Sequence, residues 1–257
     1  METKTIGFIG GGRITKIFLE AFSNKQFNLS LVSVYDINPE VLNTLKEQFP
    51  QIQVTDSIKL VAGQEIVVIA LHPPAIRETM EQIKELVTED TQVISLAPKI
   101  SIEKMSTKLV TNNIVRIIPN ATSYINEGFN PVSFANAFSA TEKQSLLEML
   151  NLLGNTFEVQ EDKLEAYAII SAMLPTYFWF QWEEIQKIGK QMGLDEEESK
   201  NAVKETLLSA ISLFYDSKLN SNEVIDLIPV KPIGEHETQI TEIYKTKLMG
   251  LFEKIKP

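Results

Sequence analysis

Three consecutive glycines offer the clearest chemistry in this chain. They follow a short apolar run, residues 6–9, and they precede a pattern of helical period that begins at Ile14. A turn of this kind presents unhindered backbone amides at the start of a helix, where a pyrophosphate binds. In such a turn Gly10 makes the tight bend, and Gly12 lets the phosphates approach. We therefore predict a dinucleotide site whose contacts are Gly10, Gly11, Gly12, Arg13, Ile14 and Thr15.

An acidic residue follows the turn at the distance that this chemistry needs. Asp36 ends the next apolar run, ~20 residues further along, where a carboxylate accepts hydrogen bonds from the ribose hydroxyls. The carboxylate would repel a 2′-phosphate, and neither Ile37 nor Asn38 supplies a positive charge to hold one. We therefore expect NAD(H) to be preferred over NADP(H). The alternative is a glycine turn without a cofactor, with Asp36 near the cap of the next helix.

The elements that must position these residues alternate between strand and helix. Apolar runs predict strands over 6–9, 29–35, 51–54, 65–71, 92–96 and 113–118, with helical patterns between them. This order predicts an α/β fold, a Rossmann-type doubly wound and mostly parallel sheet. Ligands of such sheets bind beyond the carboxyl ends of the strands. Further candidate contacts at those ends are Leu71, His72, Pro73, Ala97 and Asn120.

The alternation stops near residue 160. Two further strands are expected over 132–135 and 156–159, and helical patterns fill the rest. We predict a dinucleotide-binding domain over 1–160 and an all-helical domain over 161–257. Pro175 should kink or interrupt the first of these helices. The aromatic cluster at 178–182 is too dense for one core, which favours a homodimer through the C-terminal helices over burial within one chain.

Composition excludes several classes of function. The chain has 257 residues and a net charge of −10, so it lacks the basic stripe that nucleic acid requires. It has no cysteine and only two histidines, which excludes thiolate chemistry and a multi-histidine metal site, and we predict no metal. No leader precedes Thr5, and no apolar run approaches the ~18 residues of a membrane span. We therefore expect a cytoplasmic protein that does not contact a membrane.

Several blocks of sequence appear in the order typical of one enzyme family. They are the opening Ile6–Gly12, the strand end Ala70–Pro73, the strand Val93–Ile100, the block Arg116–Asn120, and Glu127 with Gly128. In these blocks the chain resembles the pyrroline-5-carboxylate reductases over most of its length. The resemblance implies a Rossmann domain followed by a helical dimerisation domain. It also implies reduction of a cyclic imine to proline with a nicotinamide cofactor.

The chain departs from this family where substrate should bind. The family segment S-G-S-G-P-A-Y appears here as Ser171–Tyr177, which keeps the serine, proline and tyrosine but fills both glycine positions with larger side chains. The family loop S-P-G-G-T-T has no counterpart, and Ile228–Glu237 stands in its place. His72 replaces a lysine of the family. These changes affect the expected substrate more than the expected cofactor.

Candidate roles follow from the resemblance and from side-chain chemistry. A protonated imine needs little acid catalysis, whereas a carbonyl substrate would need a proton donor within hydrogen-bond reach, such as Tyr177 or His236. Asn120 would position the nicotinamide amide or the substrate. Lys231 and the backbone near Pro175 would hold a substrate carboxylate, and Glu127, Ser171 and Thr176 are further candidate substrate contacts.

Each of these residues also has a structural alternative. Lys231 would then be a solvated loop cation, His236 a residue at a helix start, Tyr177 a core or interface aromatic, and Asn120 a cap.

Three functions therefore remain open. The first is a pyrroline-5-carboxylate or related imine reductase acting on a small imino acid. The second is a reductase or dehydrogenase of another small oxo acid, which the altered loop favours. Related hydroxy-acid dehydrogenases carry a lysine on the first helix of their helical domain, and the absence of lysine from Ala166–Trp182 counts against that branch. The third is a non-catalytic paralogue that binds a nucleotide.

Overall fold

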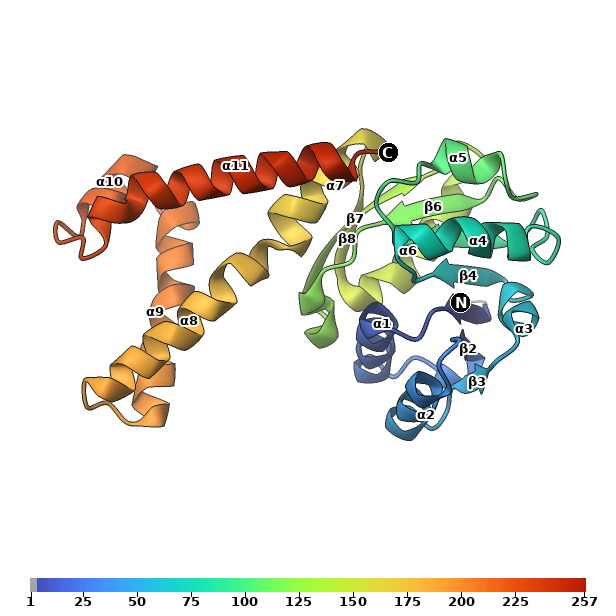
Figure 1. Cartoon of the computed structure of the whole chain (residues 1–257), viewed down its shortest axis with the longest axis horizontal. Helices are drawn as coiled ribbons and strands as arrows, with labels where there is room; N and C mark the ends of the chain where they lie inside the picture. The colour runs from blue at the N-terminus through green and yellow to red at the C-terminus, as the bar shows by residue number, and fades with distance from the viewer. Residues whose placement is uncertain (1–3) are drawn as a thin grey trace. The chain divides into compact units, whose positions relative to one another are not determined.

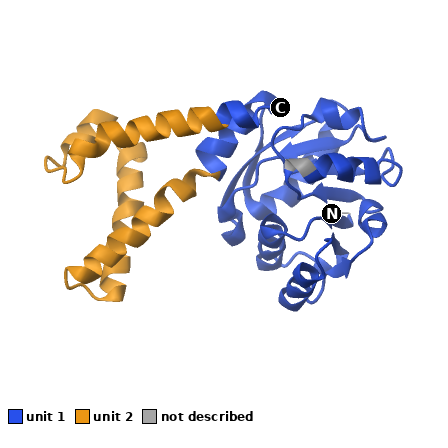
Figure 2. Cartoon of the chain, in the orientation of Figure 1, with its two compact units in different colours: residues 1–172, 252–257 blue, residues 173–251 orange. Residues whose placement is uncertain are grey.

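A computed structural model describes residues 4–257, apart from the side chains of Pro73 and Pro74. The chain forms two compact units, and Figure 2 shows them in different colours. Unit 1 comprises residues 1–172 with 252–257, and unit 2 comprises residues 173–251. Among the described helices, none is both long enough and apolar enough to cross a bilayer.

Unit 1 is built on one eight-stranded sheet, with the strand order β3-β2-β1-β4-β5-β6-β7-β8 (Figure 1). The strands are β1 (Ile6–Ile9), β2 (Val32–Tyr35), β3 (Gln53–Thr55), β4 (Ile66–Ile69), β5 (Gln92–Ser95), β6 (Ile114–Ile117), β7 (Gly128–Phe134) and β8 (Gly154–Glu158). The first six strands are parallel, β7 runs antiparallel to β6, and β8 runs parallel to β7. The predicted doubly wound, mostly parallel sheet is confirmed.

The helices of unit 1 cover this sheet. They are α1 (Arg13–Asn24), α2 (Pro39–Gln48), α3 (Ile58–Ala62), α4 (Pro73–Ile83), α5 (Ile102–Ser106), α6 (Ala140–Leu150) and α7 (Leu164–Tyr167). Because crossovers between parallel strands are right-handed, the change of direction between β1 and β4 puts α1 and α2 on one face and α4 and α5 on the other. The carboxyl ends of β1 and β4 therefore lie at the switch point of the sheet, where ligands of this fold bind.

The central strands form the floor beneath that switch point. Every residue of β1 and β4 is buried, as their apolar sequences predict for strands covered on both faces. Phe8 contacts Phe18 of α1 edge to face, with ring centres 5.6 Å apart, which packs the first helix onto the sheet. The register places Ile9 beside Tyr35 on one side and beside Ile69 on the other. Three strand ends therefore finish level with one another.

The long helix that the sequence predicts from residue 163 is divided. The segment comprises α7, a π-helix at Ala168–Ala172, and α8 (Leu174–Gln191). Pro175 lies in the first turn of α8, where a missing N–H costs no helical hydrogen bond. The proline therefore begins a helix instead of kinking one.

Unit 2 consists of α8, α9 (Glu196–Asp216), α10 (Ser221–Asp226) and most of α11 (Glu237–Ile255). Asp195 begins α9 with a reciprocal capping box to Glu198, which explains the acidic run at this helix start. Ser199 of α9 donates a hydrogen bond to the carbonyl of Gln186 on α8 at 2.8 Å. Within unit 2, Ser199 is the only buried residue, so these helices leave most of their apolar side chains exposed.

Candidate functional site

The glycine turn has the geometry that a dinucleotide requires. Gly10 has φ +104°, and a Cβ there would lie 2.6 Å from the carbonyl oxygen of Ala70, so this position accepts glycine alone. Its N–H donates to the carbonyl of Tyr35 at 2.8 Å. At Gly12, by contrast, a Cβ would meet nothing within 4 Å. The space over Gly12 is therefore open to a ligand.

The start of α1 suits an anion. Gly12 is the N-cap and offers no side chain to the helix, so the amides of Arg13 and Ile14 have no intrahelical acceptor. The first turn carries no acidic residue, although acids are common there, and it carries the cation Arg13 instead. Arg13 and Lys16 both line a cavity of about 370 Å³ between α1 and α2. Open amides, a helix dipole and two cations together fit a pyrophosphate.

The side chain of Thr15 stabilises the glycine turn. It is fully buried, and its hydroxyl donates a hydrogen bond to the carbonyl of Gly10. The larger side chain at this third position of the pattern therefore braces the bend that Gly10 makes. A glycine or alanine there would leave that carbonyl without this donor.

Asp36 holds the other side of the turn. One carboxylate oxygen accepts the N–H of Gly11 at 2.7 Å, and the other accepts the N–H of Asn38 at 2.9 Å. The side chain thus connects the end of β2 to the glycine turn of β1. A carboxylate oxygen can accept two hydrogen bonds, so each oxygen of Asp36 has a lone pair left for a ribose hydroxyl. The predicted ribose contact is compatible with this geometry.

The ends of β4 and β5 contribute the next candidates. Leu71 packs against the turn, because a Cβ at Gly10 would lie 2.9 Å from its Cδ2. His72 is the exposed N-cap of α4 and its side chain makes no capping bond. The side chain of Pro73 lies outside the described part of the chain. Ala97 is buried, and its carbonyl accepts a hydrogen bond from Nη2 of Arg116 at 3.4 Å.

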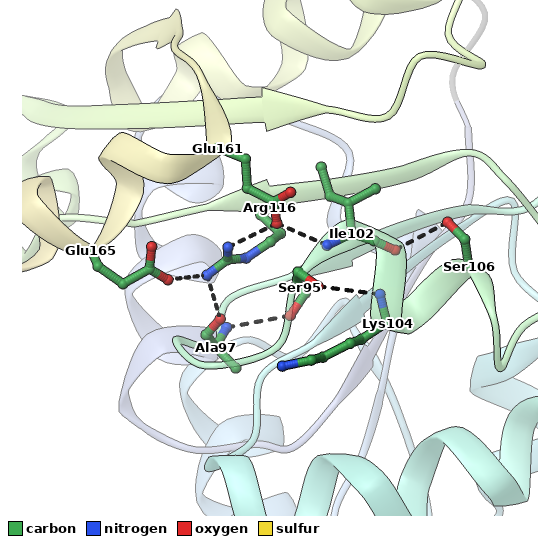
Figure 3. A network of polar contacts seen from close by, with 9 residues as sticks. Ser95, Ala97, Ile102, Lys104, Ser106, Arg116, Glu161 and Glu165 are labelled. Carbon is green, nitrogen blue, oxygen red and sulfur yellow. Dashed lines mark hydrogen bonds and ion pairs between the residues drawn. The ribbon is translucent and has the colours of Figure 1, made fainter. Parts of the chain in front are cut away.

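A buried ion-pair network lies beside that strand end (Figure 3). Arg116 of β6, with a side chain only 1% exposed, pairs with Glu161 at 2.8 Å and with Glu165 of α7. The Oε1 atom of Glu161 also accepts the N–H of Ile102 at 2.8 Å. The network therefore joins the sheet, the loop after β5, the start of α5 and the segment that leads to the π-helix.

No role was predicted for Arg116, although it lies within one of the blocks that carry the resemblance. The signal in the sequence was a cation inside the apolar run of β6, since a buried charge must have a partner. Glu161 and Glu165 lie one helical turn apart, so both carboxylates face the same way.

Asn120 connects the end of β6 to the π-helix. Its Nδ2 donates to the carbonyl and to Oγ of Ser171 at 3.2 and 3.3 Å, and its Oδ1 caps Thr122. Its own N–H donates to Oδ1 of Asn130 at 2.8 Å. Asn130 is fully buried, and among the described residues its Nδ2 has no hydrogen-bond partner. Two predicted site residues, Asn120 and Ser171, are therefore in direct contact.

Glu127 stands apart from this contact. Its side chain is exposed, and its backbone exchanges hydrogen bonds with Thr122. The remaining candidates belong to unit 2. Thr176 donates from Oγ1 to the carbonyl of Met173 at 2.6 Å, in the same first turn of α8 as Pro175.

Of the two predicted catalytic residues in unit 2, Tyr177 is half-buried and His236 is exposed. Its ring contacts that of Tyr244 on α11 edge to face, with centres 6.1 Å apart. Burial, and secondarily the proximity of Tyr244, raises the pKa of Tyr177 above the usual value for tyrosine. Lys231 and His236 are exposed and lie between α10 and α11, where Nε2 of His236 is 3.5 Å from Oε1 of Glu235. Unit 1 thus assembles the predicted cofactor contacts, and unit 2 carries Tyr177, Lys231 and His236 on separate elements.

Comparisons with known proteins point to one group of enzymes. The family model described as NADP oxidoreductase, coenzyme F420-dependent, matches residues 5–99, which contain the glycine turn. The chain is similar along nearly its whole length to the pyrroline-5-carboxylate reductase of Staphylococcus epidermidis, with 23% identity over 96% of this chain and 92% of the relative. The corresponding enzyme of Pasteurella multocida is 26% identical over 84% of this chain and 81% of its own.

Solved structures show the same architecture. The pyrroline carboxylate reductase of Plasmodium falciparum, solved with NADP bound, superposes with a TM-score of 0.79 at 21% identity, over 99% of this chain and 96% of that one. The enzyme of Coxiella burnetii gives a TM-score of 0.73 at 24% identity, over 99% and 95%. A prephenate dehydrogenase of A. aeolicus, with a TM-score of 0.56, is also similar in fold.

Proposed function

We propose that this chain belongs to the pyrroline-5-carboxylate reductase family and is a nicotinamide-dependent enzyme that reduces the C=N bond of a small cyclic imino acid. The observation that carries the proposal is the likeness to such reductases over 96% of the chain, centred on a glycine turn of the right geometry. Reduced nicotinamide, when bound, supplies the hydride. The chain's own residues must hold the two reactants together and keep water away.

The residues of unit 1 fit the cofactor. The open amides at the start of α1 and the cations Arg13 and Lys16 would hold the diphosphate, and Asp36 would hold the adenosine ribose. Leu71, His72 and Ala97, at the ends of β4 and β5, would line the nicotinamide side. The pair of Asn120 and Ser171 would then border the reacting carbon, with Glu127, Pro175, Thr176 and Lys231 as further candidates around the substrate.

Asp36 supports a preference for NAD(H). Its carboxylate lies at the end of β2 and binds the turn through Gly11, where a 2′-phosphate would meet its negative charge. Arg13 and Lys16 line the neighbouring cavity and would favour the phosphate, so the two effects compete. We infer that repulsion by the carboxylate outweighs attraction by the two cations, because the carboxylate is the group predicted to contact the ribose itself. Steady-state KM values for the two reduced cofactors test this, and a lower KM for NADPH would contradict it.

A second candidate is reduction of a different small oxo or imino acid. The exposed loop between α10 and α11, which includes Lys231 and His236, favours it, since the family's carboxylate-binding loop has no counterpart here. A carbonyl oxygen would need a proton, and Tyr177 stays protonated to high pH because its pKa is raised.

A substrate panel separates these functions. Purified protein would be mixed with NADH and with pyrroline-5-carboxylate, other cyclic imines, or oxo acids, and the loss of NADH absorbance would be followed. Turnover of a cyclic imine above all oxo acids supports the proposed reaction, and the reverse order supports the second candidate. Calorimetric binding of NADH without any turnover would instead indicate a non-catalytic paralogue, whereas no binding would contradict all three.

Unit 2 supports a homodimer. Its helices bury almost nothing, and α8 exposes three consecutive aromatic residues, Phe178, Trp179 and Phe180, by 36%, 47% and 64%. Exposed apolar patches of this kind on a helix mark a surface that another surface covers. We infer that a second copy of the chain supplies that surface, as the resemblance implies. Light scattering after gel filtration measures the mass, and a monomer at micromolar concentration would exclude this assembly.

A further inference from the structure

A cavity of about 510 Å³ opens between α4 and α5, on the other face of the sheet from α1. It shares no lining residue with the glycine turn. Three separate elements contribute charged side chains to it. The cationic residues are Arg77 on α4, Lys99 on the loop after β5, and Lys104 and Lys108 on and just after α5. We call this cavity the α4–α5 groove.

Positive charge exceeds negative charge in the α4–α5 groove. Its lining has four cations and two carboxylates, Glu78 and Glu81, which leaves two positive charges in a chain whose net charge is −10. Glu81 is already engaged by Lys84 at 3.3 Å and by Lys108 at 2.8 Å, and these two ammonium groups hold the pKa of its carboxyl below the usual value. Glu81 is therefore not available to the other cations.

The other three cations have no ion-pair partner among the described residues. No carboxylate lies within 4.0 Å of the charged nitrogens of Arg77, Lys99 or Lys104, and Glu78 instead accepts a weak hydrogen bond from Gln82 at 3.4 Å. Cations that line one concave surface repel one another, and a neighbouring carboxylate would reduce that repulsion, but no carboxylate in the described part of the chain pairs with these three. An anion bound among these three exposed cations would reduce their mutual repulsion.

The backbone at Lys99 and the buried residues beneath the groove also support a binding site. Lys99 has φ +72°, a left-handed conformation that residues with a Cβ seldom adopt, so the loop holds this lysine against its local preference. Met80 and Ile100 are buried beneath the groove, at 4% and 5% exposure, and give it a firm floor. Ammonium and guanidinium groups around a shallow cavity are the usual partners of phosphate oxygens.

We propose that the α4–α5 groove binds a small anion of the phosphate class that carries at least two negative charges. This site goes beyond the proposed reaction and does not depend on it. The direct partners of the anion are Arg77, Lys99 and Lys104, with Lys108 balancing Glu81 at the edge.

Calorimetric titration of the full-length protein with pyrophosphate, at fixed ionic strength, tests the proposal. The groove variant Arg77→Gln/Lys99→Gln/Lys104→Gln removes the three partners. The control variant Lys25→Gln/Lys59→Gln/Lys218→Gln removes the same charge from exposed positions elsewhere. We expect the wild type and the control to bind alike and the groove variant to bind about tenfold or more weakly. Equal affinity in the groove variant would show that pyrophosphate binds elsewhere, for example at the glycine turn, and would overturn the proposal, as would no binding by the wild type.

A second variant distinguishes a loss of binding from a loss of folding. Lys99→Gly removes one cation and suits the left-handed backbone, so its thermal unfolding temperature should match or exceed that of the wild type. Its affinity for pyrophosphate should nevertheless fall. Unchanged affinity in this folded variant would count against the groove.

Two further ligands distinguish the source of the phosphate. Inorganic phosphate and fructose 1,6-bisphosphate are titrated in the same way. Tighter binding of the bisphosphate would indicate a phosphorylated metabolite, and tighter binding of pyrophosphate a free phosphate species. If citrate bound as tightly as either, the assignment to the phosphate class would be wrong.

Discussion

Arg116 on β6 and Glu165 on α7 form an ion pair in which both side chains are almost completely buried, at 1% and 2% exposure. The same guanidinium reaches the carbonyl of Ala97 at the end of β5. Glu165 lies three residues before the start of the π-helix, Ala168–Ala172, which contains Ser171. One buried cation therefore holds both the end of β5, where the cofactor is expected, and the segment that leads to Ser171, where the substrate is expected.

Breaking this pair should destabilise unit 1. Arg116→Met leaves two acidic residues without their cation, and we expect a loss of about 3–5 kcal/mol in the free energy of unfolding, measured with urea. The double variant Arg116→Met/Glu165→Leu also removes the deeply buried acid and leaves only Glu161, whose side chain is 29% exposed, so it should recover much of this loss. The control is Lys187→Gln, which breaks a surface pair with Glu183 and should change stability little. An equal loss in the double and single variants would contradict this account.

Gly12→Ala should separate cofactor binding from folding. Gly12 has an ordinary φ of −71°, and a Cβ there would meet no protein atom within 4 Å, so the urea midpoint should stay near that of the wild type. The methyl group would instead fill the space through which the diphosphate approaches, and NADH binding by calorimetry should weaken about tenfold or more.

The matched control is Gly250→Ala, at another position where a Cβ meets nothing within 4 Å. It lies inside α11, so alanine should stabilise by up to ~1 kcal/mol and leave NADH binding unchanged. If both variants bound NADH like the wild type, the phosphates would not lie over Gly12.

Asp36→Asn should reduce the discrimination between the two cofactors. The amide oxygen still accepts the N–H of Gly11, but the negative charge that opposes a 2′-phosphate is gone. We expect the ratio of KM values for NADPH and NADH to fall by roughly tenfold. Asp56→Asn, an exposed acid beyond β3, is the control and should leave the ratio unchanged. A ratio unaffected by Asp36→Asn would mean that this carboxylate only braces the turn.

Tyr177 should remain protonated at alkaline pH. Burial, reinforced by Tyr244, raises its pKa in the folded chain above the unfolded value of about 10. The folded state therefore holds this proton more tightly, and its contribution to stability is complete below about pH 10 and is lost as pH rises through the folded pKa. We expect the wild type to lose stability more steeply above pH 10 than Tyr177→Phe does, as measured by urea unfolding at a series of pH values.

Phe180→Glu should dissociate the proposed homodimer. Phe180 is 64% exposed within one chain, so a charge there costs the single chain little but would be desolvated against a partner. Light scattering at increasing concentration should show a monomer for this variant and a dimer for the wild type. Lys25→Glu, which introduces an acid at an exposed position of unit 1, should remain dimeric. A dimeric Phe180→Glu would place the interface elsewhere.

Local patterns explain why most of the fold could be predicted from the sequence. Wholly apolar runs specify strands that are buried on both faces, and Gly10, with φ +104°, specifies a tight bend that a residue with a Cβ could not make. The division of the helix after residue 163 could not be read from periodicity. A π-helix keeps nearly the same spacing of apolar residues as the α-helices beside it.

The amino-acid sequence by itself determined the order of strands and helices, the glycine turn and the acid that follows it, because these depend on neighbours along the chain. Only the tertiary structure decided that Asn120 contacts Ser171, 51 residues away, and that Arg116 has two carboxylate partners. It likewise gathered Arg77, Lys99 and Lys104 around one groove. Such contacts arise where separate elements pack, and no spacing in the sequence encodes which side chains will meet there.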